Sequence, residues 1–151
     1  MVREGDFVPD FELLDQTGTK RSLSGLLVDG PVVLFFYPAA MTPGCTRESC
    51  HFRDLGAEYE AAGVQRVGIS RDSVKRQKQF ADRHSFDYPL LSDEDGTVAD
   101  LFGVARGGLL GKLGPVKRAT FAIGKDQRVI KVIISETNMH QHADDALRAF
   151  T

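Results

Sequence analysis

The chain has 151 residues, of which 42% are hydrophobic and 26% are charged, and this composition predicts one globular domain spanning residues 1–151. Lys and Arg number 19 against 21 Asp and Glu, so the formal net charge of −2 argues against a nucleic-acid-binding surface. No segment is apolar over the length of a membrane span, and the N-terminus lacks the apolar core of a signal peptide. We therefore expect a cytoplasmic protein with neither nucleic acid nor membrane as a partner.

The first part of the chain predicts short strands, then a buried strand, then a helix. Residues 6–23 favour short strands separated by turns. Residues 32–37 form an unbroken apolar run, which is typical of a central strand buried on both faces. Thr42 is the expected N-cap of the following helix and Pro43 its first residue, and helical spacing continues to a stop at Gly63.

The rest of the chain alternates predicted strands and helices. Strands are predicted over residues 64–70, 89–91, 118–123 and 129–134, the last two joined as a hairpin, and helices over 73–84, 96–102 and 140–150. The glycine-rich segment 107–115 predicts a mobile loop. This order indicates an α/β protein compatible with a thioredoxin-like fold, with a central mixed β-sheet flanked by helices and an N-terminal β extension.

Two cysteines, Cys45 and Cys50, are the strongest candidates for chemistry. In a reducing cytosol, two nearby cysteines more often indicate catalysis, redox switching or metal binding than a structural bridge. With Thr42 as the N-cap, Cys45 is the third residue of the helix, where free backbone N–H groups and the helix dipole favour a thiolate. The alternative is that Cys45 is a small buried hydrophobic residue.

Cys50 lies five positions after Cys45. An ideal helix places the Cα atoms of such a pair about 8–9 Å apart, whereas a disulfide usually requires about 7 Å or less. The two cysteines can therefore bridge only if the first turns of the helix unwind. This spacing predicts a redox-coupled conformational change rather than a structural disulfide, with core packing as the alternative role of Cys50.

Other cysteine chemistry fits the sequence less well. Thioredoxin-type motifs have two residues between the cysteines, whereas four separate Cys45 from Cys50. A zinc site could combine these cysteines with His51 and a distant histidine such as His140 or His142, but the usual finger spacings are absent. We expect no metal site, and we expect the four histidines to be surface or packed residues.

The segment around Cys45 resembles a known active site. Residues 38–46, Pro-Ala-Ala-Met-Thr-Pro-Gly-Cys-Thr, are similar to the signature of the peroxiredoxins, and Cys50 points to the subgroup called bacterioferritin comigratory protein or peroxiredoxin Q. The resemblance runs over nearly the whole chain, including the opening residues 5–13 and the segment 118–123. It implies a thioredoxin-like fold and a peroxidase that uses no metal or prosthetic group.

The resemblance also implies roles for individual residues. Cys45 matches the peroxidatic cysteine and Cys50 the resolving cysteine. Thr42 matches the hydroxyl that binds the thiolate and the peroxide, and Pro38 matches the residue that shields the pocket from water. Arg118 matches the guanidinium that holds the thiolate and polarises the peroxide, although its position alone favours a surface arginine at the end of a strand.

Two further positions bear on the predicted site. Glu48 matches an acidic position that supports the arginine. The triplet Ala39-Ala40-Met41 stands where the family often has a charged triplet, so the rim of the pocket is less charged and favours organic or lipid hydroperoxides. The expected partners are a hydroperoxide substrate and a thioredoxin-like reductant, and the expected state is a monomer or a weak homodimer.

The function implied is a thiol-dependent peroxidase. Cys45 attacks a hydroperoxide and becomes a sulfenic acid, Cys50 closes a disulfide with it, and thioredoxin or a similar dithiol reduces the bridge. One alternative is a redox-sensing interaction protein that uses the same Cys45–Cys50 switch. Another is a thiol–disulfide oxidoreductase without specificity for peroxides.

Overall fold

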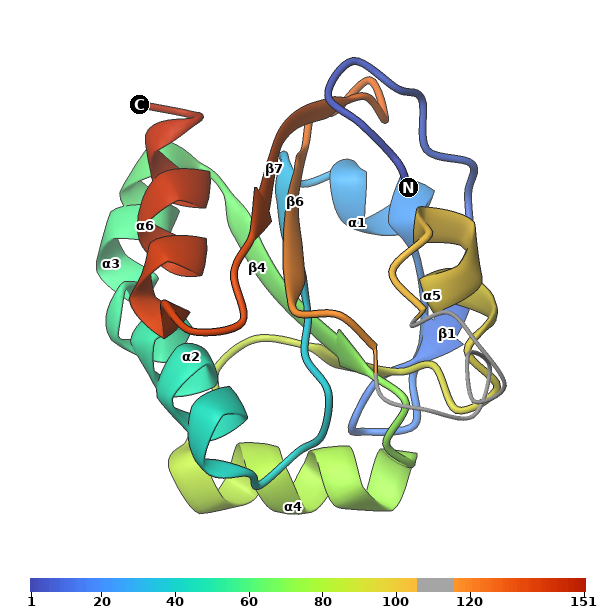
Figure 1. The fold of residues 1–151 in the computed structure, drawn as a ribbon, viewed down its shortest axis with the longest axis vertical. Helices are drawn as coiled ribbons and strands as arrows, with labels where there is room; N and C mark the ends of the chain where they lie inside the picture. Colours follow the sequence, from blue (N-terminus) through green and yellow to red (C-terminus); the bar gives the residue numbers. More distant parts are fainter. Residues whose placement is uncertain (106–115) are drawn as a thin grey trace.

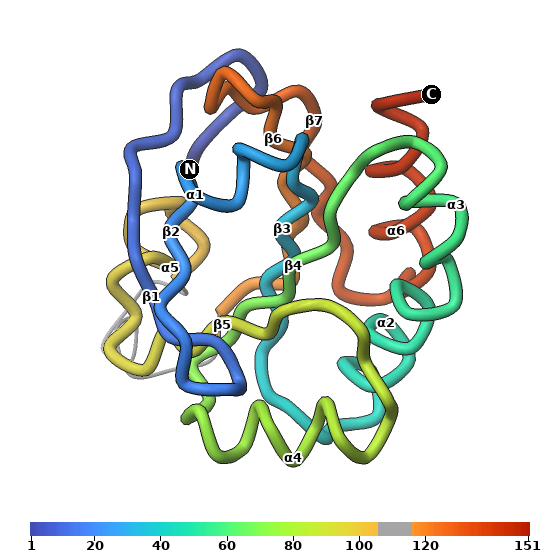
Figure 2. The backbone as a smooth tube through the Cα atoms, turned by 180° about the vertical axis from the view of Figure 1, so that it is seen from behind, coloured from blue at the N-terminus to red at the C-terminus, as the bar shows by residue number. Residues whose placement is uncertain are grey.

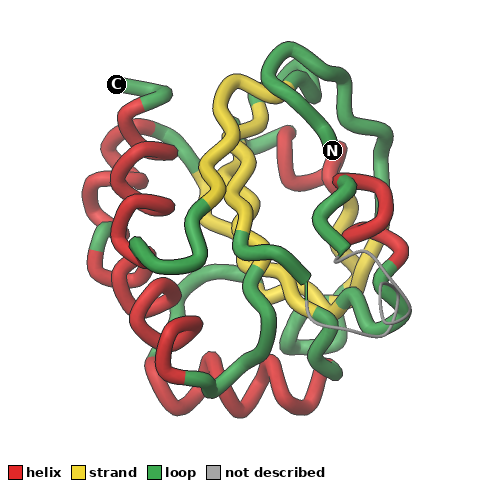
Figure 3. Tube along the Cα trace, viewed as in Figure 1, coloured by secondary structure: helices red, strands yellow, loops and turns green. Residues whose placement is uncertain are grey.

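The computed structural model describes residues 1–105 and 116–151, so the predicted loop at 107–115 lies outside the described residues. Within these ranges the strands form one mixed sheet in the order β2-β1-β5-β4-β3-β6-β7. The strands are β1 (Glu12–Leu14), β2 (Lys20–Ser22), β3 (Val32–Phe36), β4 (Gln65–Ser70), β5 (Leu90–Ser92), β6 (Ala119–Ile123) and β7 (Val129–Ile134). Figure 3 shows them as the yellow centre of the molecule.

Helices cover both faces of this sheet (Figures 1 and 2). They are α1 (Leu23–Leu27), α2 (Pro43–Asp54), α3 (Gly56–Ala62), α4 (Val74–His84), α5 (Thr97–Phe102) and α6 (Met139–Arg148). Alternate side chains of β3 point to opposite faces. Val32, Leu34 and Phe36 enter a core with α1 and α5, whereas Val33 and Phe35 enter a core with α2, α3, α4 and α6.

The pairing of strands confirms the predicted fold class. β3 is parallel to β4 and antiparallel to β6, and β4 is parallel to β5. The N-terminal β1–β2 hairpin joins the sheet through β5, as the predicted β extension. β6 and β7 form the expected antiparallel hairpin. No helix among the described residues is long and apolar enough to cross a membrane.

The single helix predicted from Thr42 to Gly63 is wrong in one respect, because the chain forms two helices that meet at Leu55. Nη1 of Arg66 donates to the Phe52 carbonyl oxygen at 3.0 Å. In a continuous α-helix this oxygen would accept a hydrogen bond from the backbone N–H of Gly56, four residues later. Gly56, the residue after the junction, also has a low helix propensity. The predicted stop at Gly63 is confirmed, with φ of 71°.

Helix α4 buries a polar residue that the pattern did not predict. Val74 and Phe80 were expected to face inward, and Phe80 is fully buried, whereas Val74 is half-buried. The other fully buried residue is Gln77, whose amide donates to Leu91 O at 2.8 Å and accepts from the hydroxyl of Tyr37. Its hydrogen bonds compensate for the loss of hydration.

Candidate active site

Strand β3 ends at the loop that leads into α2, and this junction places Cys45. Thr42 is the N-cap, Pro43 occupies the first turn, and Cys45 is the third helical residue, as predicted. Cys45 is 1% exposed, at the helix end where free backbone N–H groups gather. The Thr42 hydroxyl does not cap the helix; it donates to Ala39 O at 2.8 Å. Pro38 is half-buried and lies two residues after the end of the strand.

Arg118 reaches Cys45 from the neighbouring strand. It precedes β6, whose first residue Ala119 pairs with Phe36 at the end of β3. Nη2 of Arg118 lies 3.3 Å from Cys45 Sγ, and Nη1 lies 2.7 Å from Glu48 Oε1. The residue is 5% exposed, so the interpretation of Arg118 as a surface residue is wrong. A buried guanidinium requires such partners.

Glu48 lies one turn after Cys45 on α2 and is completely buried. Burial raises the pKa of Glu48 to about 8, although the adjacent Arg118 charge opposes this increase. Burial conversely works against the charge of Arg118, but Glu48 and Cys45 raise the pKa of the guanidinium above its usual value. Arg118 therefore stays charged beside the sulfur, whereas Glu48 holds its proton to a higher pH than an exposed glutamate.

His142 belongs to the same buried cluster, although no motif predicted it there. It lies on α6, with Nδ1 2.7 Å from Thr120 Oγ1 and 3.5 Å from Glu48 Oε2. The buried residues of α6 include Met139, His142 and Ala146, spaced by three and four positions. This spacing was the signal in the sequence, because it places residue 142 on the inward face.

Cys50 lies on the second half of α2 and is partly exposed. Both cysteines are free thiols within one continuous helix. Burial raises the pKa of Cys50 above its usual value, with Arg53 and Asp54 acting in opposite directions on it. Cys50 packs against the same hydrophobic core that contains Cys45.

Comparison with known proteins identifies the family. The model of the AhpC/TSA family matches residues 5–132. The chain belongs to the AhpC/TSA family. Its relatives are peroxiredoxins, and the chain is accordingly a peroxiredoxin, a thiol peroxidase of the oxidoreductase class.

Three relatives span nearly all of this peroxiredoxin. The crystal structure of peroxidoxin BcpB from Mycobacterium tuberculosis is 62% identical with a TM-score of 0.95, covering 99% of this chain and 97% of that one. Bacterioferritin comigratory protein of Xanthomonas campestris is 32% identical with a TM-score of 0.83, covering 93% and 89%. Chloroplastic peroxiredoxin Q of Sedum lineare is 39% identical over 154 residues, covering 97% of this chain and 77% of that protein.

The loop before α2 is held in place by hydrogen bonds from the segment around α4. Ala40 is buried, and its backbone N–H donates to Asp72 Oδ2 at 2.8 Å. The Ala40 carbonyl accepts from Arg76 at 3.4 Å. Met41 has φ of 65°, a left-handed conformation that is unfavourable for its side chain. The bonds to Asp72 and Arg76 hold the residue next to Met41 and so stabilise this conformation.

The histidines do not form a metal site with the cysteines. Among residues 1–105 and 116–151, no three His, Cys, Asp or Glu side chains form a group that could hold a metal ion. His51 stacks on His140 with ring centroids 4.1 Å apart, and its Nε2 lies 2.7 Å from Asp144 Oδ1. These contacts join α2 to α6 near Cys50.

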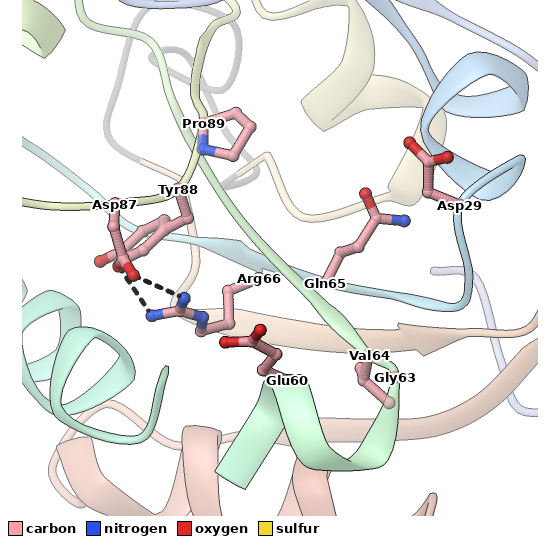
Figure 4. A pocket seen from close by; sticks show the side chains of 9 residues that line it. All are labelled: Asp29, Glu60, Gly63, Val64, Gln65, Arg66, Asp87, Tyr88 and Pro89. Carbon is pink, nitrogen blue, oxygen red and sulfur yellow. Dashed lines mark hydrogen bonds and ion pairs between the residues drawn. The ribbon is translucent and has the colours of Figure 1, made fainter. Parts of the chain in front are cut away.

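A hollow of about 420 Å³ lies away from this peroxiredoxin site, at the start of β4 (Figure 4). Arg66 forms an ion pair there with Asp87, at 3.0 Å, and its guanidinium lies over the ring of Tyr88. The same guanidinium bonds the carbonyl of Phe52. Two of the residues that line the hollow, Arg66 and Tyr88, thus bond to carbonyl oxygens of α2, and none of the lining residues is a predicted site residue.

Proposed function

We propose that the chain reduces hydrogen peroxide and organic hydroperoxides through Cys45, with Cys50 as the resolving cysteine and thioredoxin or a similar dithiol protein as the reductant. The observation that carries the proposal is the contact of 3.3 Å between Arg118 Nη2 and the buried sulfur of Cys45. A fixed cation at the first turn of a helix is the environment that favours a reactive thiolate.

In the first step the Cys45 thiolate attacks the terminal oxygen of the peroxide. The S–O bond forms while the O–O bond breaks, and both electrons of the O–O bond leave with an alkoxide or hydroxide, which takes up a proton. The sulfur is oxidised to a sulfenic acid and the peroxide is reduced to an alcohol or water. Arg118 and the backbone N–H groups of the helix start stabilise the charge that moves from sulfur to oxygen. Thr42 supplies a hydroxyl at the same end.

In the second step Cys50 attacks the sulfenic sulfur, the S–S bond forms and water leaves. Both cysteines lie in the continuous helix α2. The part of the helix that contains them must therefore unwind before the two sulfur atoms can meet. Unwinding breaks the bond from the Tyr88 hydroxyl to Ser49 O, at 2.6 Å, and the bond from Arg66 to Phe52 O. A dithiol reductant then restores both thiols by exchange.

The rim of the site favours organic hydroperoxides as substrates. Ala39, Ala40 and Met41 present no charge where a polar triplet would attract water, and Met41 packs against the core that contains Cys45. The relative from Xanthomonas campestris has a described alkyl peroxide reduction activity. We expect cumene hydroperoxide to react at least as fast as hydrogen peroxide.

The proposal includes a single domain, a monomer or weak homodimer, and a cytoplasmic location, where a reduced dithiol pool is available. Sedimentation over a range of concentrations tests the oligomeric state. The location is tested by fractionating the cells that produce the protein.

Steady-state turnover separates this function from its alternatives. The assay couples peroxide reduction to thioredoxin and thioredoxin reductase, and the expected result is many turnovers per protein molecule. A single oxidation per molecule would favour the redox-sensing protein, in which the Cys45–Cys50 switch alters a binding surface. Rapid insulin reduction together with slow peroxide turnover would favour a general thiol–disulfide oxidoreductase.

A further inference from the structure

His142 is a fully buried histidine whose two ring nitrogens both face polar groups. Nε2 lies 2.8 Å from the Ser135 carbonyl oxygen, and Nδ1 lies 2.7 Å from the Thr120 hydroxyl. A carbonyl oxygen can only accept, so Nε2 carries the proton of the neutral ring and Thr120 donates to Nδ1. Burial lowers the pKa of His142, which favours this neutral form.

The same Nδ1 atom faces the Glu48 carboxyl group. Glu48 Oε1 accepts from Arg118, whereas Oε2 lies 3.5 Å from His142 Nδ1 and makes no hydrogen bond with the described residues. Burial raises the pKa of Glu48 to about 8, so this carboxyl keeps its proton to a higher pH than an exposed glutamate does. Nδ1 has one electron pair, so a proton on Oε2 at 3.5 Å competes for it with the Thr120 hydroxyl at 2.7 Å, whereas an ionised Oε2 is repelled by it.

We propose that His142 is a positioning residue for the peroxidase reaction: its Nδ1 atom orients and neutralises the Glu48 carboxyl group, which in turn aims Arg118 at Cys45. This inference rests on the proposed function. When Glu48 is neutral, the charge of Arg118 acts on the Cys45 sulfur without a competing carboxylate. When Glu48 is ionised, it shares that charge and adds a negative charge one helical turn from the thiolate.

Other charged groups face the same cluster. Glu136 follows β7, and its carboxylate accepts from the backbone N–H of Arg118 at 3.0 Å. The charge of Glu136 raises the pKa of Glu48 in addition to burial, and the charges of Glu136 and Asp145 act on His142 as well. These two carboxylates are present in all the variants described below. A change in the pH profile of a reaction therefore reports the substitution of His142 itself.

A purely structural His142 would act differently from a positioning one. A structural role depends on the ring volume and on the bond from Nε2 to Ser135, which fastens α6 to the chain after β7. The positioning role depends on Nδ1. Two substitutions separate these roles, because an asparagine amide lies near the position of Nδ1 and a glutamine amide lies near that of Nε2.

The test measures His142→Asn and His142→Gln in two single-turnover reactions of reduced protein between pH 5 and pH 9. One reaction is the oxidation of Cys45 by hydrogen peroxide, and the other is its alkylation by iodoacetamide in a Cys50→Ser background. We expect Cys45 of the His142→Gln variant to be oxidised about tenfold more slowly than in the parent protein. The midpoint of its alkylation profile should shift by about half a pH unit or more. His142→Asn is expected to remain within about threefold of the parent, through partial rescue at Nδ1.

The matched control is His140→Gln, the same change at an exposed position of α6, which is expected to leave both profiles unchanged. If His142→Asn and His142→Gln lose equal activity with unshifted profiles, the positioning role is overturned. Should either variant fail to fold, Thr120→Val removes the donor to Nδ1 with little change in shape, and an unshifted profile in that variant also overturns it.

The proposed function and this inference fail separately. If the unsubstituted protein is oxidised no faster than free cysteine, the peroxidase function is contradicted. The alkylation profile still reports whether His142 acts on Cys45, because alkylation involves no peroxide.

Discussion

Cys45 and Cys50 lie on the same helix in different surroundings. Cys45 is 1% exposed at the first turn of α2 and lies 3.3 Å from a guanidinium nitrogen. Cys50 is partly exposed, and burial raises its pKa. In the proposed mechanism, the first environment favours the attacking thiolate, and the second keeps a thiol that reacts only after the sulfenic acid has formed. One helix thus gives two cysteines, about a turn and a half apart, different environments, and the proposed disulfide requires that the helix unwind between them.

The largest expected effect is the loss of the attacking sulfur. Cys45→Ser should abolish peroxidase activity, because a serine hydroxyl is not ionised near neutral pH and cannot form a sulfenic acid. The measurement is steady-state peroxide consumption with thioredoxin. Substantial remaining turnover would show that Cys45 is not the nucleophile.

Removal of the other sulfur should leave the first turnover intact. Cys50→Ser is expected to be oxidised by one equivalent of peroxide within about twofold of the parent rate, because the contact of Arg118 with Cys45 is unchanged. Recycling by thioredoxin should stop, and intact mass should show added oxygen on Cys45. Normal recycling in this variant would remove Cys50 from the mechanism.

The cation beside Cys45 accounts for the next effect. Arg118→Met removes two hydrogen-bond donors near the reacting atoms, and the oxidation rate should fall by about a hundredfold. The control is Arg47→Met, an exposed arginine of the same helix. Equal losses in both variants would mean that net charge, rather than the contact with Cys45, controls the rate.

Gly44 offers a smaller perturbation of the same contact. A Cβ atom at this position would lie 3.3 Å from Arg118 Nη2 and 3.4 Å from the Met139 methyl carbon, so both groups must shift slightly. We expect Gly44→Ala to slow oxidation by about threefold to tenfold while leaving thermal stability nearly unchanged, since alanine also favours the helix. An unchanged rate would show that Arg118 tolerates displacement.

Glu48 predicts a dependence of stability on pH. Its folded pKa of about 8 lies above the usual value, so the folded state binds this proton more tightly, and stability falls as pH rises from about 4.5 to about 8. In the parent protein the release of this proton should lower the free energy of unfolding by an amount on the order of 2 kcal/mol between pH 5 and pH 8, and Glu48→Gln should remove this decrease. Urea unfolding of both proteins at the two pH values measures it, and identical pH slopes would contradict the assignment.

The sequence predicted those parts of the fold that depend on neighbouring residues. The apolar run of β3 and the Thr-Pro start of α2 were together sufficient to predict that Cys45 is the third residue of the helix. The break at Leu55 was not predicted, because the local signal of Gly56 is weak and the bond from Arg66 to Phe52 O comes from the next strand. Local patterns report local preferences, whereas such contacts depend on the tertiary arrangement.

In the site, too, the sequence predicted some residues, whereas others depend on tertiary contacts. The family signature identified Cys45, Cys50 and Arg118 as candidates, but a motif names residues without giving their contacts. His142 was missed because its partners, Thr120 and Glu48, lie on β6 and α2, far from it in the chain. Its inward position was readable from the spacing of apolar residues on α6, whereas its role depends on the cluster that the fold brings together.

The most direct test of the difference between the two cysteines is stopped-flow oxidation of the reduced protein by one equivalent of cumene hydroperoxide, with intact mass measured on the product. We predict a rate far above that of free cysteine and a product that has lost two hydrogen atoms, as a Cys45–Cys50 disulfide requires. A rate equal to that of free cysteine, with no disulfide, would contradict both the activation of Cys45 and the resolving role of Cys50.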